Sequence, residues 1–327
     1  MIDRNTMDER SSKQLKSDVV EKARSLGIAL VRSCPVERWD ELPLQDPEYR
    51  PKAMMPWARN VLVMGIPLYI PMVASTPSMV YQELYNTTNR VLDDAAYRMT
   101  GFLTGLGYRA MYFPRDGYFG IDVLLKDHTA AFSHVLAAYY SGMGTIGDSH
   151  NLLTREFGPR VRIVSVVTDA PLEPDGMLEE DLCIHCGRCL RDCPSHSFSD
   201  DGSRPYRMDM EACTRYHIHL KEQHHWPCGI CIRTCPVGED MRRYRGTVPM
   251  TPEGVAHCGR KGSRRSLPAS IHGSQIPVAD DPPVEACYGI RRIASALRDY
   301  PLGLRLENGI HPGVDDGTSS AGRDVGG

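Results

Sequence analysis

Two cysteine-rich stretches, CIHCGRCLRDCP at residues 183–194 and CGICIRTCP at residues 228–236, decide which fold and chemistry this chain of 327 residues can support. In the first stretch three cysteines recur with two residues between them, and a fourth follows after three further residues, directly before Pro194. Three thiolates so spaced can wrap an iron–sulfur cubane from one loop, while a distant cysteine closes the opposite corner. In ferredoxins with two clusters, the cysteine before proline ligates the other cluster. The pattern therefore predicts two [4Fe–4S] clusters.

The second stretch is an abbreviated copy of the first, and it is completed by Cys213 upstream. Structural zinc sites use pairs of C-x2-C separated by a spacer, so the uninterrupted run favours iron–sulfur clusters over zinc. The crossing rule divides the eight cysteines equally. We expect one cluster on Cys183, Cys186, Cys189 and Cys235, and the other on Cys193, Cys213, Cys228 and Cys231.

The remaining cysteines are predicted to lie in a reducing environment. The N-terminus has neither an apolar signal core nor a twin-arginine pair, which predicts a cytoplasmic protein whose thiols stay reduced. Cys34, Cys258 and Cys287 lack ligand spacing and are predicted to be free thiols. The net charge of -3 favours neither a nucleic-acid nor a membrane partner, and no apolar run is long enough to span a bilayer.

The residues before the cysteines have the pattern of a layered α/β domain, because segments of helical periodicity alternate with short apolar runs. The expected helices are 12–26, 78–106 and 128–141, and the expected strands are 28–33, 60–68, 109–114 and 160–168. The strand at 60–68 is continuously apolar, which predicts burial on both faces.

The composition also predicts domain boundaries. We expect an α/β domain at 1–178 and a metal-dependent module at 179–248, whose density of Cys, Pro and Gly leaves little core of its own. A C-terminal extension at 249–310 is expected to pack on the core, and 311–327 to form a disordered tail.

Two further stretches carry a family resemblance, LAAYYSGMGTIG at 136–147 and NLLTREFGPRVRIVSVVTDAPLEPD at 151–175. With the cysteine motifs, they resemble the epoxyqueuosine reductase and reductive dehalogenase superfamily over about residues 55–240. The resemblance implies a nitroreductase-like, cobalamin-binding α/β layer domain followed by a ferredoxin-like 2[4Fe–4S] module. It further implies an oxidoreductase in which electrons from a ferredoxin or flavodoxin pass through both clusters to the corrinoid. That corrinoid would reduce a small organic substrate or a modified nucleoside.

The resemblance also suggests site residues. Gly142, Gly144, Gly147 and Asn151 are expected to contact the corrinoid, although the same glycines suit a helix end and a tight turn. Counting back from Gly142 to the position of the family's acidic proton donor gives His128, with Asp127 beside it. An ordinary polar helix start is the alternative for these two residues. Dehalogenases share a tyrosine paired with a basic residue, and Tyr118 with Lys126 is the matching pair here.

Some features depart from the family and keep other functions open. The second motif continues Cys235-Pro236-Val237-Gly238 where the family usually has C-P-W-N. The sequence has no helical-repeat domain after the cysteines and no basic patch, so tRNA is a possible partner that the charge does not support. The main alternative is an iron–sulfur electron carrier that docks to an enzyme and performs no corrinoid chemistry. A flavin-binding reductase is the third hypothesis.

Overall fold

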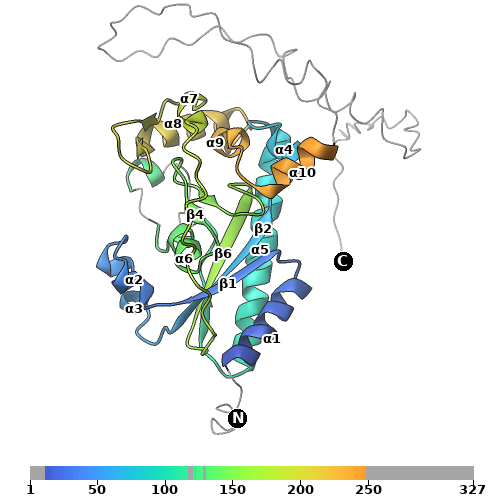
Figure 1. The fold of residues 1–327 in the computed structure, drawn as a ribbon, viewed down its shortest axis with the longest axis vertical. Coiled ribbons are helices and arrows are strands. Elements are labelled where there is room, and N and C mark those ends of the chain that lie inside the picture. The colour runs from blue at the N-terminus through green and yellow to red at the C-terminus, as the bar shows by residue number, and fades with distance from the viewer. Residues whose placement is uncertain (1–11, 117–120, 122, 128–129, 248–327) are drawn as a thin grey trace, which may run out of the picture. The chain divides into compact units, whose positions relative to one another are not determined.

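The computed structural model describes residues 12–116, 121, 123–127 and 130–247 (Figure 1). The chain divides into two compact units, 1–269 and 270–327, and all described residues belong to the first. The predictions for 249–310 and 311–327 lie outside the described residues. Within the first unit the predicted division at residue 178 stays a prediction. Among the described helices, none is both long and apolar enough to cross a membrane.

The centre of the fold is a four-stranded sheet with the order β1-β2-β6-β3, in which every neighbouring pair is antiparallel. The long central strands pair in a register that places Val63 opposite Ser165. Seven of the eight residues of β2 are buried, as its apolar sequence predicts. The strands are β1 (Leu30–Pro35), β2 (Asn60–Pro67), β3 (Ala110–Tyr112) and β6 (Val161–Thr168).

Two helices, α1 (Ser12–Ser25) and α5 (Met79–Gly105), cover one face of this sheet (Figure 1). Ser78 caps α5 by accepting a hydrogen bond from the Tyr81 amide, which satisfies one of the free donors of the first turn. Leu92, Met99 and Leu103 recur with helical periodicity and are fully buried. Both helices have the bounds that the sequence predicts to within two residues.

The opposite face of the sheet packs against α6 (His134–Tyr140) and the aromatic side chains of Trp39, Phe132 and Tyr140. Neighbouring residues of β2 point to different layers, with Leu62 in the α1/α5 core and Val63 in the α6 core. Because helices lie on both faces of the sheet, β6 is buried along most of its length. The described residues therefore form a mixed α/β structure of three layers.

The helix expected at 128–141 is shorter than predicted. Residues 128 and 129 lie outside the described residues, and 130–133 are not helical. The helix starts at His134 because Ser133 acts as its cap, accepting a hydrogen bond from the Leu136 amide. Serine is among the preferred N-cap residues, so the correct start was encoded in the sequence.

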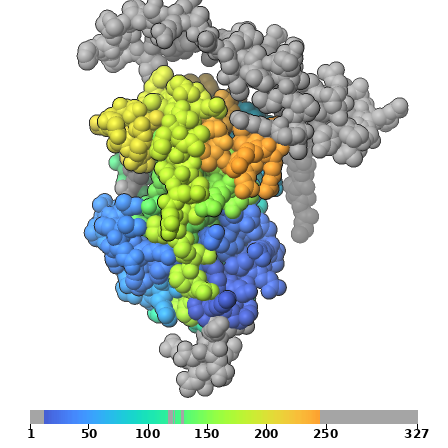
Figure 2. All heavy atoms as spheres, viewed as in Figure 1, coloured from blue at the N-terminus to red at the C-terminus, as the bar shows by residue number. Residues whose placement is uncertain are grey.

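The segment that follows β6 is tied down across the N-terminal elements. In Figure 2 its yellow-green surface runs between blue surfaces of the N-terminal residues. Lys16 donates to a carboxylate oxygen of Asp175 at 2.5 Å, and the Ser33 amide donates to the same oxygen at 2.7 Å. The segment thus leaves the sheet along a fixed path toward the cysteine motifs.

The cysteine-rich part consists of short elements. A β4–β5 hairpin (Thr145–Ile146 and Leu152–Leu153) precedes β6 in the sequence and lies beside the first cysteine stretch. The remaining elements are α7 (Arg188–Arg191), β7 (Phe198–Ser199), β8 (Arg207–Met208), α8 (Met210–Glu222), α9 (Ile230–Thr234) and α10 (Glu239–Thr247). Shorter pieces in the first part of the chain are α2 (Arg38–Glu41), η2 (Pro47–Tyr49), α3 (Pro51–Met54), α4 (Ile70–Val73) and η3 (Val123–Leu125).

Candidate metal centres and the adjoining cavity

The cysteines predicted to hold the first cluster line one cavity together. Cys183 and Cys186 come from the loop before α7, Cys189 from α7 itself, and Cys235 from the end of α9. The hairpin turn closes the cavity with Gly147 and other residues, and Cys186 is exposed to solvent. We call these four cysteines the first set. The fold brings together the members that sequence spacing alone places 52 residues apart.

The other four cysteines line a second, larger cavity of about 390 Å³. Cys193 follows α7, Cys213 lies on α8, and Cys228 and Cys231 lie before and within α9. We call them the second set. The two cysteines that precede a proline therefore change places. Cys193 of the first stretch lines the second cavity, and Cys235 of the second stretch lines the first cavity, as the crossing rule predicts.

The two halves also share a local geometry. Each contains a C-G-x-C sequence, and Gly187 and Gly229 occupy the left-handed region with φ of 68° and 67° directly before α7 and α9. A Cβ atom on Gly229 would stand 2.5 Å from the ring of Tyr81, so glycine is required there for space as well as for conformation. The repeated turn presents two cysteines of each set from the start of a short helix.

The chemistry of this donor set fits a cation-containing cluster. Burial raises the pKa of Cys213 and of Cys228 to about 12, and that of Cys235 to about 11. Buried thiols of this kind stay protonated unless a positive charge compensates the thiolates. Because each set consists of four sulfur ligands, both sets suit [4Fe–4S] clusters, which are held by four thiolates.

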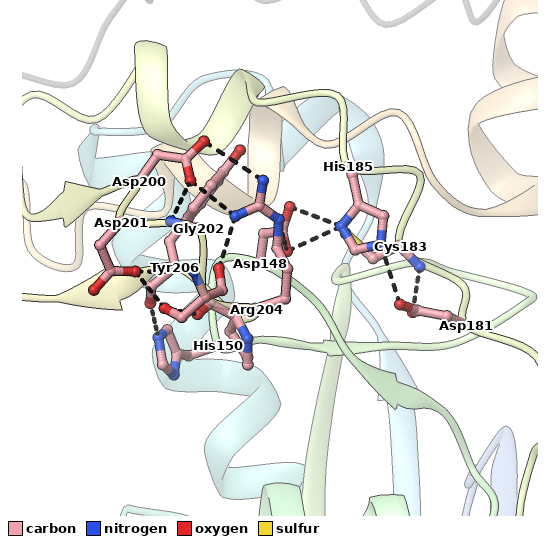
Figure 3. A network of polar contacts seen from close by, with 12 residues as sticks. Asp148, His150, Asp181, Cys183, His185, Asp200, Asp201, Gly202, Arg204 and Tyr206 are labelled. Atoms are coloured by element: carbon pink, nitrogen blue, oxygen red, sulfur yellow. Dashed lines mark hydrogen bonds and ion pairs between the residues drawn. The ribbon is translucent and has the colours of Figure 1, made fainter.

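One mixed group of ligands adjoins the first set (Figure 3). Potential ligand atoms of Asp148, Cys183 and His185 lie within 4.8 Å of one another. Nδ1 of His185 lies 3.1 Å from both carboxylate oxygens of Asp148, which is almost fully buried, and Nε2 lies 3.3 Å from Asp181. These contacts hold the Cys183 loop against the hairpin. Nitrogen, oxygen and sulfur ligands of these kinds also bind zinc.

The predicted corrinoid-contacting glycines approach the chain itself in the structure. A Cβ on Gly142 would lie 1.9 Å from the Gly176 carbonyl oxygen, and one on Gly144 would lie 2.1 Å from the Leu153 carbonyl oxygen. Gly147 faces the Leu153 side chain and lines the first cavity. Close packing within the protein therefore explains these glycines, and their contact with a corrinoid stays a prediction.

Asn151 has a different position from the glycines. Its side chain lines the second cavity and also a neighbouring cavity of about 290 Å³ in front of α6. The two cavities share a wall and together form what we call the chamber. The shared lining residues are Asp116, Asn151, Arg162 and Ile232.

A polar network that sequence analysis missed crosses this wall. Arg162 donates to Asp116 at 2.9 Å and to the side-chain oxygen of Asn89 at 2.8 Å. Tyr85 donates from its hydroxyl to Asp116, while its ring lies 4.3 Å from the Arg162 guanidinium carbon. Trp226 packs edge-on against Tyr85, so aromatic surface surrounds the ion pair. An arginine within a mostly apolar strand was the available signal.

Of the four predicted catalytic residues, the structure describes two, and neither of these lines the chamber. His128 and Tyr118 lie outside the described residues. Lys126 and Asp127 follow η3, are exposed, and do not line the described cavities. The catalytic roles of all four residues stay predictions. A histidine that does line the chamber is His134, whose ring contacts Ser165 and the Pro114 carbonyl, each at 2.9 Å.

Comparison with known proteins gives two kinds of relative. No family model matches the chain. It is 25% identical to a tetrachloroethene reductive dehalogenase of Desulfitobacterium hafniense over 201 residues, which cover 54% of this chain and 34% of the relative. It is 24% identical to an epoxyqueuosine reductase of Synechococcus sp. over 254 residues, covering 68% of this chain and 73% of that one.

A solved structure agrees with these relatives in fold. A catabolic reductive dehalogenase superposes with a TM-score of 0.55 at 20% identity, over 76% of this chain and 36% of that one. The chain belongs to the epoxyqueuosine reductase and reductive dehalogenase superfamily. The chain matches about a third of the length of the dehalogenase from Desulfitobacterium hafniense. The relatives of both kinds are named as redox enzymes.

Proposed function

We propose that the chain is an iron–sulfur oxidoreductase that uses cobalamin to reduce a small organic substrate or a modified nucleoside. The observation that carries the proposal is the division of eight cysteines into two cavities of four, the second of which shares lining residues with the cavity in front of α6. Residues 179–248 would then act as a ferredoxin-like 2[4Fe–4S] module. The names of both kinds of relative support reductive chemistry.

The positions of the two sets suggest the order of electron transfer. Cys186 of the first set is exposed, which suits electron entry from a ferredoxin or flavodoxin. The second set lines one half of the chamber, and the other half, in front of α6, is the proposed place of the substrate. Electrons would therefore enter at the first cluster and leave from the second.

Several groups that line the chamber support a corrinoid site. Phe132 and Ile232 supply apolar surface, and Asn151, Asp116 and Arg162 supply polar groups that can orient amide side chains of the cofactor or polar groups of the substrate. Cobalamin supplies a strongly reducing cobalt centre, and the protein positions it and provides protons. His128 with Asp127, or Tyr118 with Lys126, remain the proposed proton donors.

The electron-carrier alternative predicts an upstream half without a deep pocket. The cavity of about 290 Å³ in front of α6 does not favour it, because this cavity has no cysteine in its lining and is close in size to small-ligand sites. The direct test is to purify the protein without oxygen, measure iron and sulfide, and record visible spectra with and without added cobalamin. The proposal expects about eight irons per chain and a spectral change on cobalamin uptake. Iron without cobalamin uptake would leave only electron transfer, and zinc would remove both functions.

A further inference from the structure

The turn between β4 and β5 holds Asn151 at a fixed place beside the second set. The Gly147 amide donates to the Asn151 carbonyl at 3.0 Å, and the His150 amide donates to the Gly147 carbonyl at 2.8 Å. His150 itself has a φ of 60°, and its Nε2 donates to the Tyr206 carbonyl at 2.6 Å. These bonds fix the backbone from which the Asn151 side chain reaches the chamber.

The orientation of the Asn151 amide follows from its partners. Its Nδ2 atom lies 3.2 Å from the Ser149 carbonyl oxygen, 3.0 Å from the Ser149 hydroxyl and 3.4 Å from Sγ of Cys231. A carbonyl oxygen only accepts hydrogen bonds, so the atom facing it must be the nitrogen. One hydrogen of the amide is then directed to Ser149, and the other is directed to the sulfur.

Side-chain hydrogen bonds to sulfur distinguish the two sets. In the second set Asn151 donates to Cys231, and the Ser195 hydroxyl lies 3.4 Å from Sγ of Cys193. A ligating thiolate has no hydrogen to give, so Ser195 donates to it and accepts from Ser197 at 2.6 Å. Within the part of the chain that the structure describes, no side chain makes such a bond to a sulfur of the first set.

We propose that Asn151 is a positioning residue that raises the reduction potential of the cluster on the second set. The inference rests on the proposed function, because it requires that a cluster is bound there. Reduction adds negative charge to the cluster and its sulfurs, so an N–H group directed at Cys231 stabilises the reduced form more than the oxidised form. Ser195 acts in the same direction from Cys193. The reduced second cluster is thereby stabilised beside the cavity in front of α6.

The test is a redox titration of the anaerobically purified full chain, in which electron paramagnetic resonance monitors the reduction of each cluster. The Cys186→Ser variant marks the step that belongs to the first cluster. We expect Asn151→Leu, which keeps the branched shape without the N–H group, to lower the potential of the other step only. Asn151→Asp should lower this potential further, because an ionised carboxylate adds negative charge without a donor. Ser195→Ala should lower the potential of the same step.

Iron content measured for each variant separates a change in potential from loss of a cluster. If Asn151→Leu retains iron but leaves both steps in place, or moves both equally, the inference is wrong. Should Asn151→Leu fail to assemble, Ser195→Ala decides, and an unchanged second step in that variant also overturns the inference. A wild-type chain without iron would instead refute the proposed function.

Discussion

Arg160 forms a two-pronged ion pair with Asp240, with nitrogen–oxygen distances of 2.7 and 2.8 Å, although the residues are 80 positions apart. The arginine is 1% exposed and also donates to the carbonyl oxygens of Cys235 and Val237. It therefore joins the start of β6 to the segment that supplies the last cysteine of the first set.

Removing one partner of this pair is expected to destabilise the protein strongly. Asp240→Ala leaves a buried guanidinium without its counter-charge, which typically costs about 3–5 kcal/mol of unfolding free energy. Chemical denaturation measures the loss, and iron content should fall as Cys235 loses its support. Arg98→Ala, which breaks an exposed pair on α5, is the matched control and should be nearly neutral. Equal effects of the two variants would contradict this account of Arg160.

The Tyr85–Asp116 contact predicts a smaller change in stability. Tyr85→Phe removes one hydrogen bond to a charged group while keeping the ring against Arg162, so we expect a loss of about 1–2 kcal/mol in unfolding free energy. Thr87→Ala, which removes an exposed hydroxyl from the same helix, should have little effect. A Tyr85→Phe protein as stable as the wild type would show that Asp116 finds another donor.

His134 predicts a dependence of stability on pH. Burial lowers its pKa to about 4 from a usual value near 6.5. Nε2 donates to the Pro114 carbonyl, so Nδ1 of the neutral ring accepts from Ser165. Between pH 6.5 and 4 the unfolded chain binds a proton that the folded chain excludes. The free energy of unfolding should therefore decrease by about 1.4 kcal/mol for each pH unit as the pH falls through this window.

The measurement compares melting temperatures of the wild type and His134→Gln from pH 7 to pH 4. Gln keeps a donor for the Pro114 carbonyl but does not titrate. The difference in melting temperature between the two proteins should be constant above pH 6.5 and should change steadily as the pH falls from 6.5 to 4. Parallel profiles would show that His134 is not excluded from protonation.

Gly142 predicts a steric effect with a built-in control. Gly142→Ala places a Cβ 1.9 Å from the Gly176 carbonyl oxygen at a φ of 67° and should destabilise the fold by more than about 1 kcal/mol. Gly101→Ala lies inside α5 with nothing within 4 Å of the new Cβ, and should stabilise by about 0.5–1 kcal/mol. Thermal unfolding should therefore shift in opposite directions. A tolerated Gly142→Ala would show that the 176 segment can move away.

The sequence could predict features that depend on local patterns. The predicted cysteine sets follow from the spacing in two short stretches, from Cys213 upstream of the second and from the crossing rule. The helix α5 follows from the periodicity of residues such as Leu92 and Met99. The partners of Gly142 and Arg162 could not be predicted, because each contact joins segments that are distant in sequence. Nor does alternation of helices and strands fix strand direction, and here every pair in the central sheet is antiparallel.

The cysteines allow the most direct test of the metal assignment. Cys231→Ser should remove the second cluster and reduce iron from about eight to about four atoms per chain, with partial unfolding of the module because metal binding supplies folding free energy. Cys34→Ser is the control. Cys34 lies on β1 and is fully buried against α6, and burial raises its pKa to about 12, so it should not affect iron content. If Cys231→Ser retains all its iron, or if Cys34→Ser loses half, the division into two sets is wrong.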